Sequence, residues 1–253
     1  MTRSTLRNSC AALWFAFAAW TGAAQADEIS LLSSAAMKEV LLELVPEFEK
    51  ASGHKVVLMW AGGVDIARRI RVGEVVDAVV LARPPVEALV NEGKLARDGR
   101  VDLARSGVGI AVRAGAPRPD ISNADAIRRA LLAAKSIAYS SGPSGTHIKE
   151  LIKRMGIVEE VKGKVLQTTP GNPVGNYVAR GEAEIGFQQV GELLPIAGID
   201  FLGPLPSDVQ EITVFSIGLH AAARTPLATR ALMRFLSSPA VAPVLRKKGM
   251  DPA

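Results

Sequence analysis

Short apolar runs alternate with longer amphipathic segments along most of the chain. Residues 28–32, 55–60 and 78–81 are short runs typical of buried strands, and each precedes a segment with helical spacing. In the first such segment, 37–52, the apolar positions are Val40, Leu41, Leu44, Val45 and Phe48. Strands that alternate with helices predict a parallel sheet covered by helices on both faces.

The same alternation continues after a Pro/Gly-rich stretch near residue 116. Further strands are expected at 108–112, 136–139, 164–166, 185–187 and 213–219, with helices at 121–134, at 148–155 and within 226–246. Connections near Ser106 and Pro206 divide the chain into a discontinuous first lobe, 27–106 with 207–253, and a second lobe, 107–206. The predicted fold class is therefore α/β, with two lobes and a two-strand hinge.

The first 26 residues have the pattern of an export signal. Arg3 and Arg7 precede an apolar segment, and the sequence from Ala24 to Ala26 has the small side chains that a signal peptidase cuts after. We expect cleavage near Ala26 and a soluble, periplasmic mature chain, since no other run approaches the length of a membrane span. Cys10 is the only cysteine and falls in the removed part, so no thiol chemistry is expected.

The mature chain has a mild positive charge. Removal of 26 residues leaves 227 and takes away two arginines, so the net charge falls from +5 to +3. This charge suits a small anionic ligand better than nucleic acid, which favours dense Lys/Arg clusters with interleaved aromatic residues. The three histidines, His54, His147 and His220, are scattered, and we expect neither a metal site nor a cofactor.

The segment from Ser140 to His147 is the first candidate for ligand binding. It joins an expected strand to an expected helix through Gly142, Pro143 and Gly145, which leaves backbone N–H groups free to bind an anion. The alternative is an ordinary turn in which Ser144 caps the helix and nothing binds. The spacing of its Gly, Ser and Lys residues excludes a Walker loop, a dinucleotide fingerprint and a nucleophile elbow.

Two further residues near the expected strand ends are candidates for ligand binding and catalysis. Arg83 follows the third strand, where a guanidinium can bind a carboxylate through two hydrogen bonds; the alternative is a surface ion pair with Glu87. His147 would lie in the first turn of a helix, which favours the neutral imidazole that accepts a proton. It is therefore a candidate base, and the alternative is a histidine that only packs.

Several segments together resemble the molybdate-binding-protein-like branch of the type II periplasmic substrate-binding proteins. The similarity covers Phe48 to Lys50, Gly62 to Ile70, Asp77 to Ala82, Arg180 to Gly186 and Phe235 to Pro239. The resemblance implies two α/β lobes that close over a small anion. It also implies an ABC permease as partner, and we expect the protein to be a monomer.

The departures from this family point to a different ligand. The two serine hydroxyls that bind molybdate in the family fall on Ala36 and Gly63, although Ser33 or Ser34 could replace the first. The family's tyrosine after the strand at Gly186 is replaced by Gln188 or Gln189. With Arg83 beside the expected cleft, these changes predict an organic carboxylate or polycarboxylate in place of molybdate.

Other segments resemble a subset of the family, aconitate isomerase. They are Ser140 to His147, Pro170 to Gly175, Gly186 to Gln189 and Gly203 to Pro206. This subset implies an allylic proton shift, with His147 as the expected base. The residues expected to bind the ligand are Ser33, Ser34, Ala36, Gly63, Arg83, Ser144, Gly145, Thr146, Pro173, Val174 and Gln188.

Three functions follow from these patterns. The first hypothesis is a solute-binding protein that delivers a small anion to an ABC transporter. The second is an isomerase acting on aconitate. The third is capture of molybdate or tungstate, with backbone amides in place of the missing hydroxyls.

Overall fold

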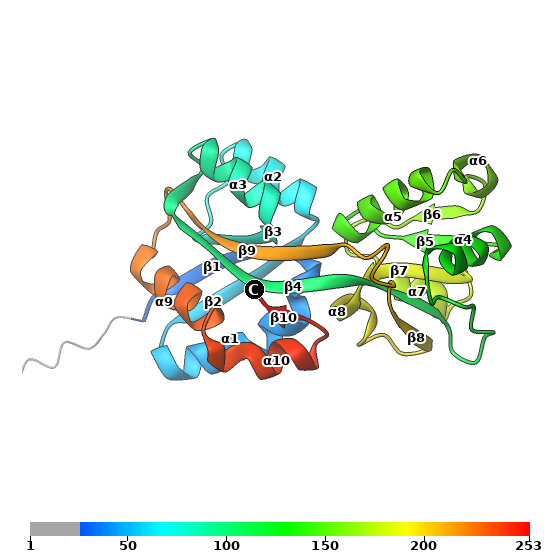
Figure 1. Cartoon of the computed structure of the whole chain (residues 1–253). Helices are drawn as coiled ribbons and strands as arrows, with labels where there is room; N and C mark the ends of the chain where they lie inside the picture. The colour runs from blue at the N-terminus through cyan, green and yellow to red at the C-terminus, as the bar shows by residue number, and fades with distance from the viewer. Residues whose placement is uncertain (1–25) are drawn as a thin grey trace, which may run out of the picture.

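The computed structural model describes residues 26–253, which form two α/β lobes joined by two long strands (Figure 1). The expected signal peptide lies outside the described residues except for Ala26. Within the described part of the chain, no helix has the length and apolar character needed to cross a membrane.

The first lobe is built from both ends of the described chain. Its elements are β1 (Glu28–Ser34), η1 (Ala35–Met37), α1 (Lys38–Ser52), β2 (Lys55–Ala61), α2 (Gly63–Arg71), β3 (Ala78–Ala82), α3 (Arg83–Asn91), α9 (Pro226–Leu236), η2 (Pro239–Val241), α10 (Ala242–Lys247) and β10 (Asp251–Pro252). The apolar face predicted for residues 37–52 is confirmed, because all five of its predicted apolar positions in α1 are buried.

The second lobe is one continuous stretch of chain. Its elements are α4 (Ala124–Ala133), β5 (Ile137–Tyr139), α5 (Pro143–Arg154), α6 (Val158–Val161), β6 (Val165–Gln167), α7 (Val174–Ala179), β7 (Ile185–Gln189), α8 (Val190–Leu193) and β8 (Ile199–Pro204). The helix expected from residue 148 begins five residues earlier, at Pro143. Proline is favoured in the first turn of a helix, and Gly142 caps it in an extended conformation.

Two strands cross between the lobes. β4 (Leu95–Arg113) pairs with β9 (Ile212–His220) as far as Gly107 and with β7 and β8 from Val108 onward. The strand expected at 108–112 is only the second half of β4; its first half alternates charged and apolar residues and was not predicted. Strand order is β2-β1-β3-β9-β4-β7-β5-β6, with β8 and β10 also paired to β4.

The strand directions bring the expected ligand loops of the two lobes together. β3 and β4 both run antiparallel to β9, so the parallel strands β1, β2 and β3 end facing the second lobe. β7 runs antiparallel to β4 and parallel to β5, so β5, β6 and β7 end facing the first lobe. Ligands of open α/β sheets bind beyond the carboxyl ends of the strands.

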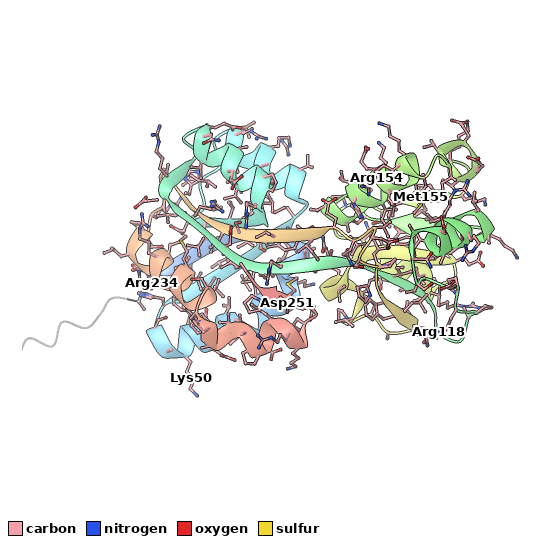
Figure 2. All side chains as sticks on the ribbon, viewed as in Figure 1. Lys50, Arg118, Arg154, Met155, Arg234 and Asp251 are labelled. Atoms are coloured by element: carbon pink, nitrogen blue, oxygen red, sulfur yellow. The ribbon has the colours of Figure 1, made fainter. Side chains whose placement is uncertain are left out.

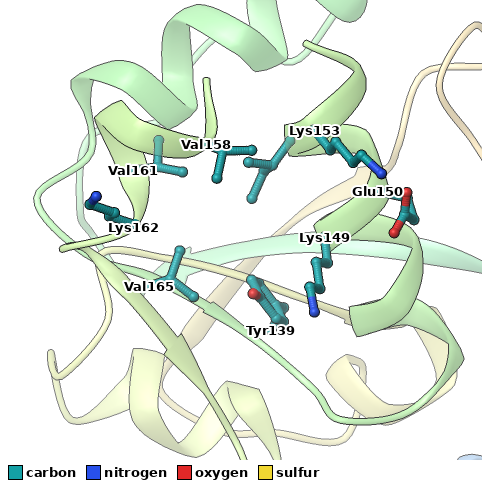
Figure 3. Close-up of a pocket in the computed structure, with 9 residues that line it drawn as sticks. Tyr139, Lys149, Glu150, Lys153, Val158, Val161, Lys162 and Val165 are labelled. Atoms are coloured by element: carbon teal, nitrogen blue, oxygen red, sulfur yellow. The ribbon is translucent and has the colours of Figure 1, made fainter. Parts of the chain in front are cut away.

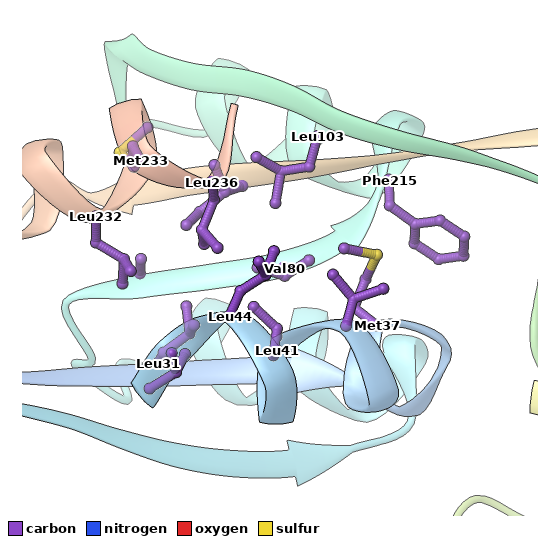
Figure 4. Close-up of a cluster of buried hydrophobic side chains, with 14 of the residues drawn as sticks. Leu31, Met37, Leu41, Leu44, Val80, Leu103, Phe215, Leu232, Met233 and Leu236 are labelled. Carbon is purple, nitrogen blue, oxygen red and sulfur yellow. The ribbon is translucent and has the colours of Figure 1, made fainter. Parts of the chain in front are cut away.

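The largest apolar core holds the first lobe together (Figure 4). In it, Leu41 and Leu44 of α1 pack with Val80 of β3, Phe215 of β9 and Leu232 of α9. Side chains of the two hinge strands, Leu103 among them, belong to the same cluster. β9 and the first half of β4 are therefore part of the apolar core of the first lobe.

Candidate functional site

The expected ligand residues surround the junction where the strand ends of the two lobes face each other. We call this region the inter-lobe junction; it comprises the ends of β1, β2, β3, β5, β6 and β7 and the helices that follow them. Two observations show that its sides meet. Gly62, the N-cap of α2, lies against Pro170 of the second lobe, and α8 packs against η1 of the first.

The first lobe offers one shielded hydroxyl at the junction. Ser34 ends β1 and caps η1, and its Oγ is buried without a hydrogen-bond partner among the described residues. The Ser33 hydroxyl instead donates to the Ser34 carbonyl oxygen, at 3.1 Å. Ala36 is buried in η1 and Gly63 begins α2, so neither adds a hydroxyl. Of the two serines, Ser34 is better placed to donate to a ligand.

Gly62 allows the two lobes to approach closely. A Cβ atom at this position would lie 2.7 Å from Cγ of Pro170, closer than carbon atoms can pack. At Gly63 the same atom would lie 3.6 Å from its nearest neighbour, Cδ2 of Leu81, which is an ordinary contact.

We therefore expect Gly62→Ala to weaken ligand binding several-fold, because the added methyl group holds the lobes apart. Gly63→Ala is the matched control and should bind within about twofold of the unchanged protein. Calorimetric titration of both variants with the same ligand measures the difference. Equal dissociation constants for the two variants would show that the close approach of the lobes at Gly62 does not matter for binding.

On the second lobe, the segment from Ser140 leads into the first turn of α5, which begins at Pro143. The hydroxyls of Ser140 and Ser144 lie 2.9 Å apart, and the Gly142 amide donates to Ser140 Oγ at 3.2 Å. The first intrahelical bond runs from the Thr146 amide to the Gly142 carbonyl oxygen, so the amides of Ser144 and Gly145 precede it. The expected alternative, Ser144 as N-cap, is wrong, because Gly142 has that position.

Both ring nitrogens of His147 have partners inside the protein. Its Nε2 lies 2.7 Å from the Val209 carbonyl oxygen and its Nδ1 lies 2.8 Å from a carboxylate oxygen of Glu211. Both partners accept hydrogen bonds, and the side chain is 4% exposed. A base needs a free lone pair within reach of substrate. The geometry therefore favours the packing alternative, in which His147 fastens α5 to the segment that leads into β9.

Gln188 and Glu192 form a hydrogen-bonded chain at the end of β7. The Val174 amide, at the start of α7, donates to Gln188 Oε1 at 2.8 Å. Gln188 Nε2 in turn donates to Glu192 Oε1, also at 2.8 Å. Gln188 is buried, and Pro173 is the N-cap of α7 beside it. Of the predicted residues, Pro173, Val174 and Gln188 are thus brought together.

Glu192 is the functional candidate that sequence reasoning missed. Glu192 is half-buried, and its carboxylate is held by the amide of Gln188. This burial raises the pKa of Glu192 to about 7, against the opposing effect of the Gln188 hydrogen bond. An acidic residue three positions beyond the end of a buried strand was the available sequence signal.

Gln189 belongs to the hinge. Its amide oxygen accepts from the Thr213 hydroxyl of β9 at 2.9 Å in the orientation that also lets its nitrogen donate to Ser106 of β4. Of the two glutamines considered as replacements for the family's tyrosine, only Gln188 reaches α7.

Arg83 is held by an aspartate of the hinge. Its Nη2 lies 2.6 Å from Oδ2 of Asp102, whose other oxygen receives hydrogen bonds from Arg100 and Ser216. Arg83 is therefore paired with Asp102 and not with Glu87. Its side chain is 40% exposed at the start of α3, on the junction side of the first lobe.

A separate cavity of about 520 Å³ lies on the second lobe (Figure 3). α5, α6, β5 and β6 form its walls, and Lys149, Lys153, Lys162 and Tyr139 line it among apolar side chains. Burial raises the pKa of Tyr139. None of the expected site residues lines this cavity. Elsewhere on the surface, the labelled cations Lys50, Arg118, Arg154 and Arg234 lie far apart over both lobes (Figure 2).

The fold and this junction define a class of protein. Residues 29–251 match the family described as bacterial extracellular solute-binding protein. The chain belongs to this family.

Two curated proteins resemble the chain over most of their length. An aconitate isomerase of a Pseudomonas species is 36% identical over 230 residues, covering 88% of this chain and 87% of that protein. The molybdate-binding protein ModA of Azotobacter vinelandii is 25% identical over 236 residues, covering 90% and 91%. These similarities confirm the resemblance to molybdate-binding-like proteins, with aconitate isomerase among them.

A solved structure shows the same fold. The periplasmic molybdate-binding protein of Azotobacter vinelandii superposes with a TM-score of 0.73 at 18% identity, covering 88% of this chain and 98% of that one. The predicted two-lobe type II binding-protein fold is therefore confirmed.

Proposed function

We propose that this protein is a periplasmic enzyme that interconverts cis- and trans-aconitate at the inter-lobe junction. The observation that carries the proposal is the 36% identity to an aconitate isomerase across 88% of the chain. The segments expected to bind ligand fall within the matched length. Export through cleavage near Ala26 is part of the same proposal.

The chemistry of the junction supports a carboxylate ligand. Arg83 supplies a guanidinium, and the amides at the start of α5 and the Ser34 hydroxyl supply neutral donors. A carbanion formed next to a carboxylate spreads its charge onto that carboxylate, where such donors stabilise it. The absence of hydroxyls at Ala36 and Gly63 disfavours molybdate or tungstate in the same place.

Capture of a carboxylate for an ABC permease is the second candidate function. It is favoured by membership of a solute-binding family. A carrier needs the same anion contacts but no group that moves a proton. The two functions therefore differ in turnover and not in affinity.

The test is incubation of the mature protein with each aconitate isomer separately, followed by proton NMR. An isomerase brings both samples to one mixture at a rate proportional to protein concentration. A carrier binds aconitate in calorimetry and leaves both spectra unchanged. Tight molybdate binding without any aconitate binding would overturn the proposal and support the third hypothesis.

We expect Arg83→Ala to weaken aconitate binding by about tenfold or more, because one charged hydrogen-bond donor is lost. Asp102 keeps Arg100 and Ser216 as partners, so the fold should persist. The matched control is Arg100→Ala, which removes the other cation on Asp102. Calorimetry of both variants separates the effects, and an unchanged dissociation constant for Arg83→Ala would remove this residue from the site.

A further inference from the structure

We propose that Glu192 is the group that takes the proton from aconitate and returns it. The inference rests on the isomerase function proposed above and adds the residue that performs its central step. It follows from the position of the carboxylate in the inter-lobe junction and from the hydrogen bonds that hold it there.

Glu192 lies where the two lobes meet. α8 follows the junction end of β7 directly and packs against η1, the first turn after Ser34. In Figure 1, α8 lies on the side of the second lobe that faces the first. The helix that carries Glu192 therefore lies where the two lobes meet, as a proton carrier between two carbons of a bound ligand needs to.

Gln188 orients this carboxylate. One end of its amide is fixed by the Val174 backbone N–H and the other end donates to Glu192 Oε1, each over 2.8 Å. Gln188 satisfies one oxygen, and no other hydrogen bond to Glu192 is found in residues 26–253. Its second oxygen, Oε2, is then available to accept a proton.

The charges around Glu192 leave it without an ionic partner. η1 and β7, which pack against α8, have no titratable side chain. The neighbouring elements α7 and β8 contribute Tyr177 and Asp200. β4 contributes Arg97, Asp98, Arg100, Asp102, Arg105 and Arg113. None of these is paired with Glu192 in the described part of the chain. The backbone of Lys248 lies against Gly191, but its ammonium pairs with Glu39 and Glu43.

Burial without an ionic partner keeps both protonation states accessible near neutral pH. The raised pKa of about 7 means that the carboxylate form, which removes a proton, and the acid form, which donates one, are both populated. A group with a pKa near the working pH is best suited to transfer protons in both directions.

The proposed step balances without any other reactant. Glu192 takes a proton from the methylene carbon of aconitate, and the C–H electron pair forms a new double bond to the central carbon. The original double bond opens toward its carboxylate, giving a delocalised carbanion. The protonated Glu192 then donates the same proton to the former vinylic carbon, which becomes the methylene. Nothing is oxidised or reduced, and the enzyme returns to its starting state.

The test compares Glu192→Gln with the matched control Glu182→Gln. Glutamine keeps the shape of the side chain and its hydrogen bond from Gln188 but cannot take up a proton. Glu182 pairs with Arg180 on the exposed surface of the same lobe, so its loss should leave turnover unchanged. Turnover of Glu192→Gln should fall by about 10²- to 10⁴-fold, with aconitate affinity within about threefold.

The pH profile of the unaltered protein gives a second readout that a structural role would not produce. Because the carboxylate form starts the reaction, kcat/KM should rise with pH through an inflection near 7 and then level off. This readout does not depend on the folding of any variant.

The outcomes separate the two proposals. An unaltered protein that converts neither isomer overturns the isomerase function, and the role of Glu192 falls with it. An active protein with no inflection near pH 7 overturns only the role of Glu192. The role of Glu192 is also overturned if a folded Glu192→Gln variant keeps turnover within about threefold of the Glu182→Gln control. It is likewise overturned if this variant loses aconitate affinity as strongly as it loses turnover.

Discussion

Replacing Asp77 by alanine should lower the free energy of unfolding by about 3 kcal/mol or more. The side chain is 2% exposed, and its two oxygens accept four hydrogen bonds. The amide and hydroxyl of Ser30 donate to Oδ2 at 2.8 and 2.6 Å, and the amides of Arg224 and Thr225 donate to Oδ1 at 2.7 and 2.9 Å. These bonds join β1 and β3 to the segment before α9, and alanine would leave all four donors without their acceptor.

The melting temperature measures this loss, with an expected fall of about 6–12 °C. Asp98→Ala is the matched control, because Asp98 forms an ion pair with Arg230 on an exposed surface and should leave the melting temperature nearly unchanged. Equal melting temperatures for the two variants would show that Asp77 does not hold these segments together.

The Asp77 contribution also depends on pH. Burial alone would raise the pKa of Asp77, but the hydrogen bonds from Ser30, Thr225 and Arg224 outweigh it and hold the pKa below its ordinary value. Because the pKa of Asp77 is lower in the folded than in the unfolded protein, ionised Asp77 stabilises the fold at any pH above its unfolded-state pKa. This stabilisation is lost as the pH falls through its folded-state pKa. The free energies of unfolding of the unaltered protein and of the Asp77→Asn variant should therefore differ less below about pH 4 than at neutral pH.

Among single Gly→Ala substitutions in the second lobe, we expect Gly145→Ala to be the most damaging. A Cβ atom at Gly145 would lie 1.5 Å from the Ser140 carbonyl oxygen, which no rotamer can relieve. The backbone from Ser140 to Gly145 would have to move, at a cost of about 3 kcal/mol or more. Because this segment supplies the first amides of α5, ligand affinity should fall together with the melting temperature.

Gly142→Ala tests the same segment without the clash. The nearest atom to its added Cβ is Ser140 Oγ at 3.6 Å, and its φ of −87° suits any residue. Thermal melting and calorimetry should therefore find Gly142→Ala close to the unaltered protein and Gly145→Ala far below it. An unaffected Gly145→Ala variant would mean that this tight turn differs in solution.

The apolar pattern was sufficient to predict the layered parts of the fold. The spacing in α1 identified every residue of its buried face, because one face of that helix contacts the core and the other contacts water. The first half of β4 was missed because this part of the hinge, near Arg97, Arg100 and Arg105, keeps charged side chains that are at least partly exposed. Such a strand lacks the clean apolar signal of a buried one.

The candidate site was less predictable, because its chemistry depends on contacts between distant segments. The environment of His147 is set by Val209 and Glu211, more than sixty residues away, and the sequence pattern indicated only its helical position. The importance of Glu192 likewise depends on the packing of α8 against η1 and on the hydrogen bond from Gln188, neither of which spacing reveals. The strand ends and the turns that follow them were predictable from the apolar pattern and the turn residues.

The measurement that tests the central claim most directly starts from trans-aconitate labelled with ¹³C at the CH carbon of its double bond. The labelled compound is incubated with the purified mature protein and followed by carbon NMR. An allylic proton shift moves the double bond, so the labelled carbon should appear as the methylene of the cis-aconitate formed. No conversion, or cis-aconitate with the label still on the vinylic carbon, would contradict the account.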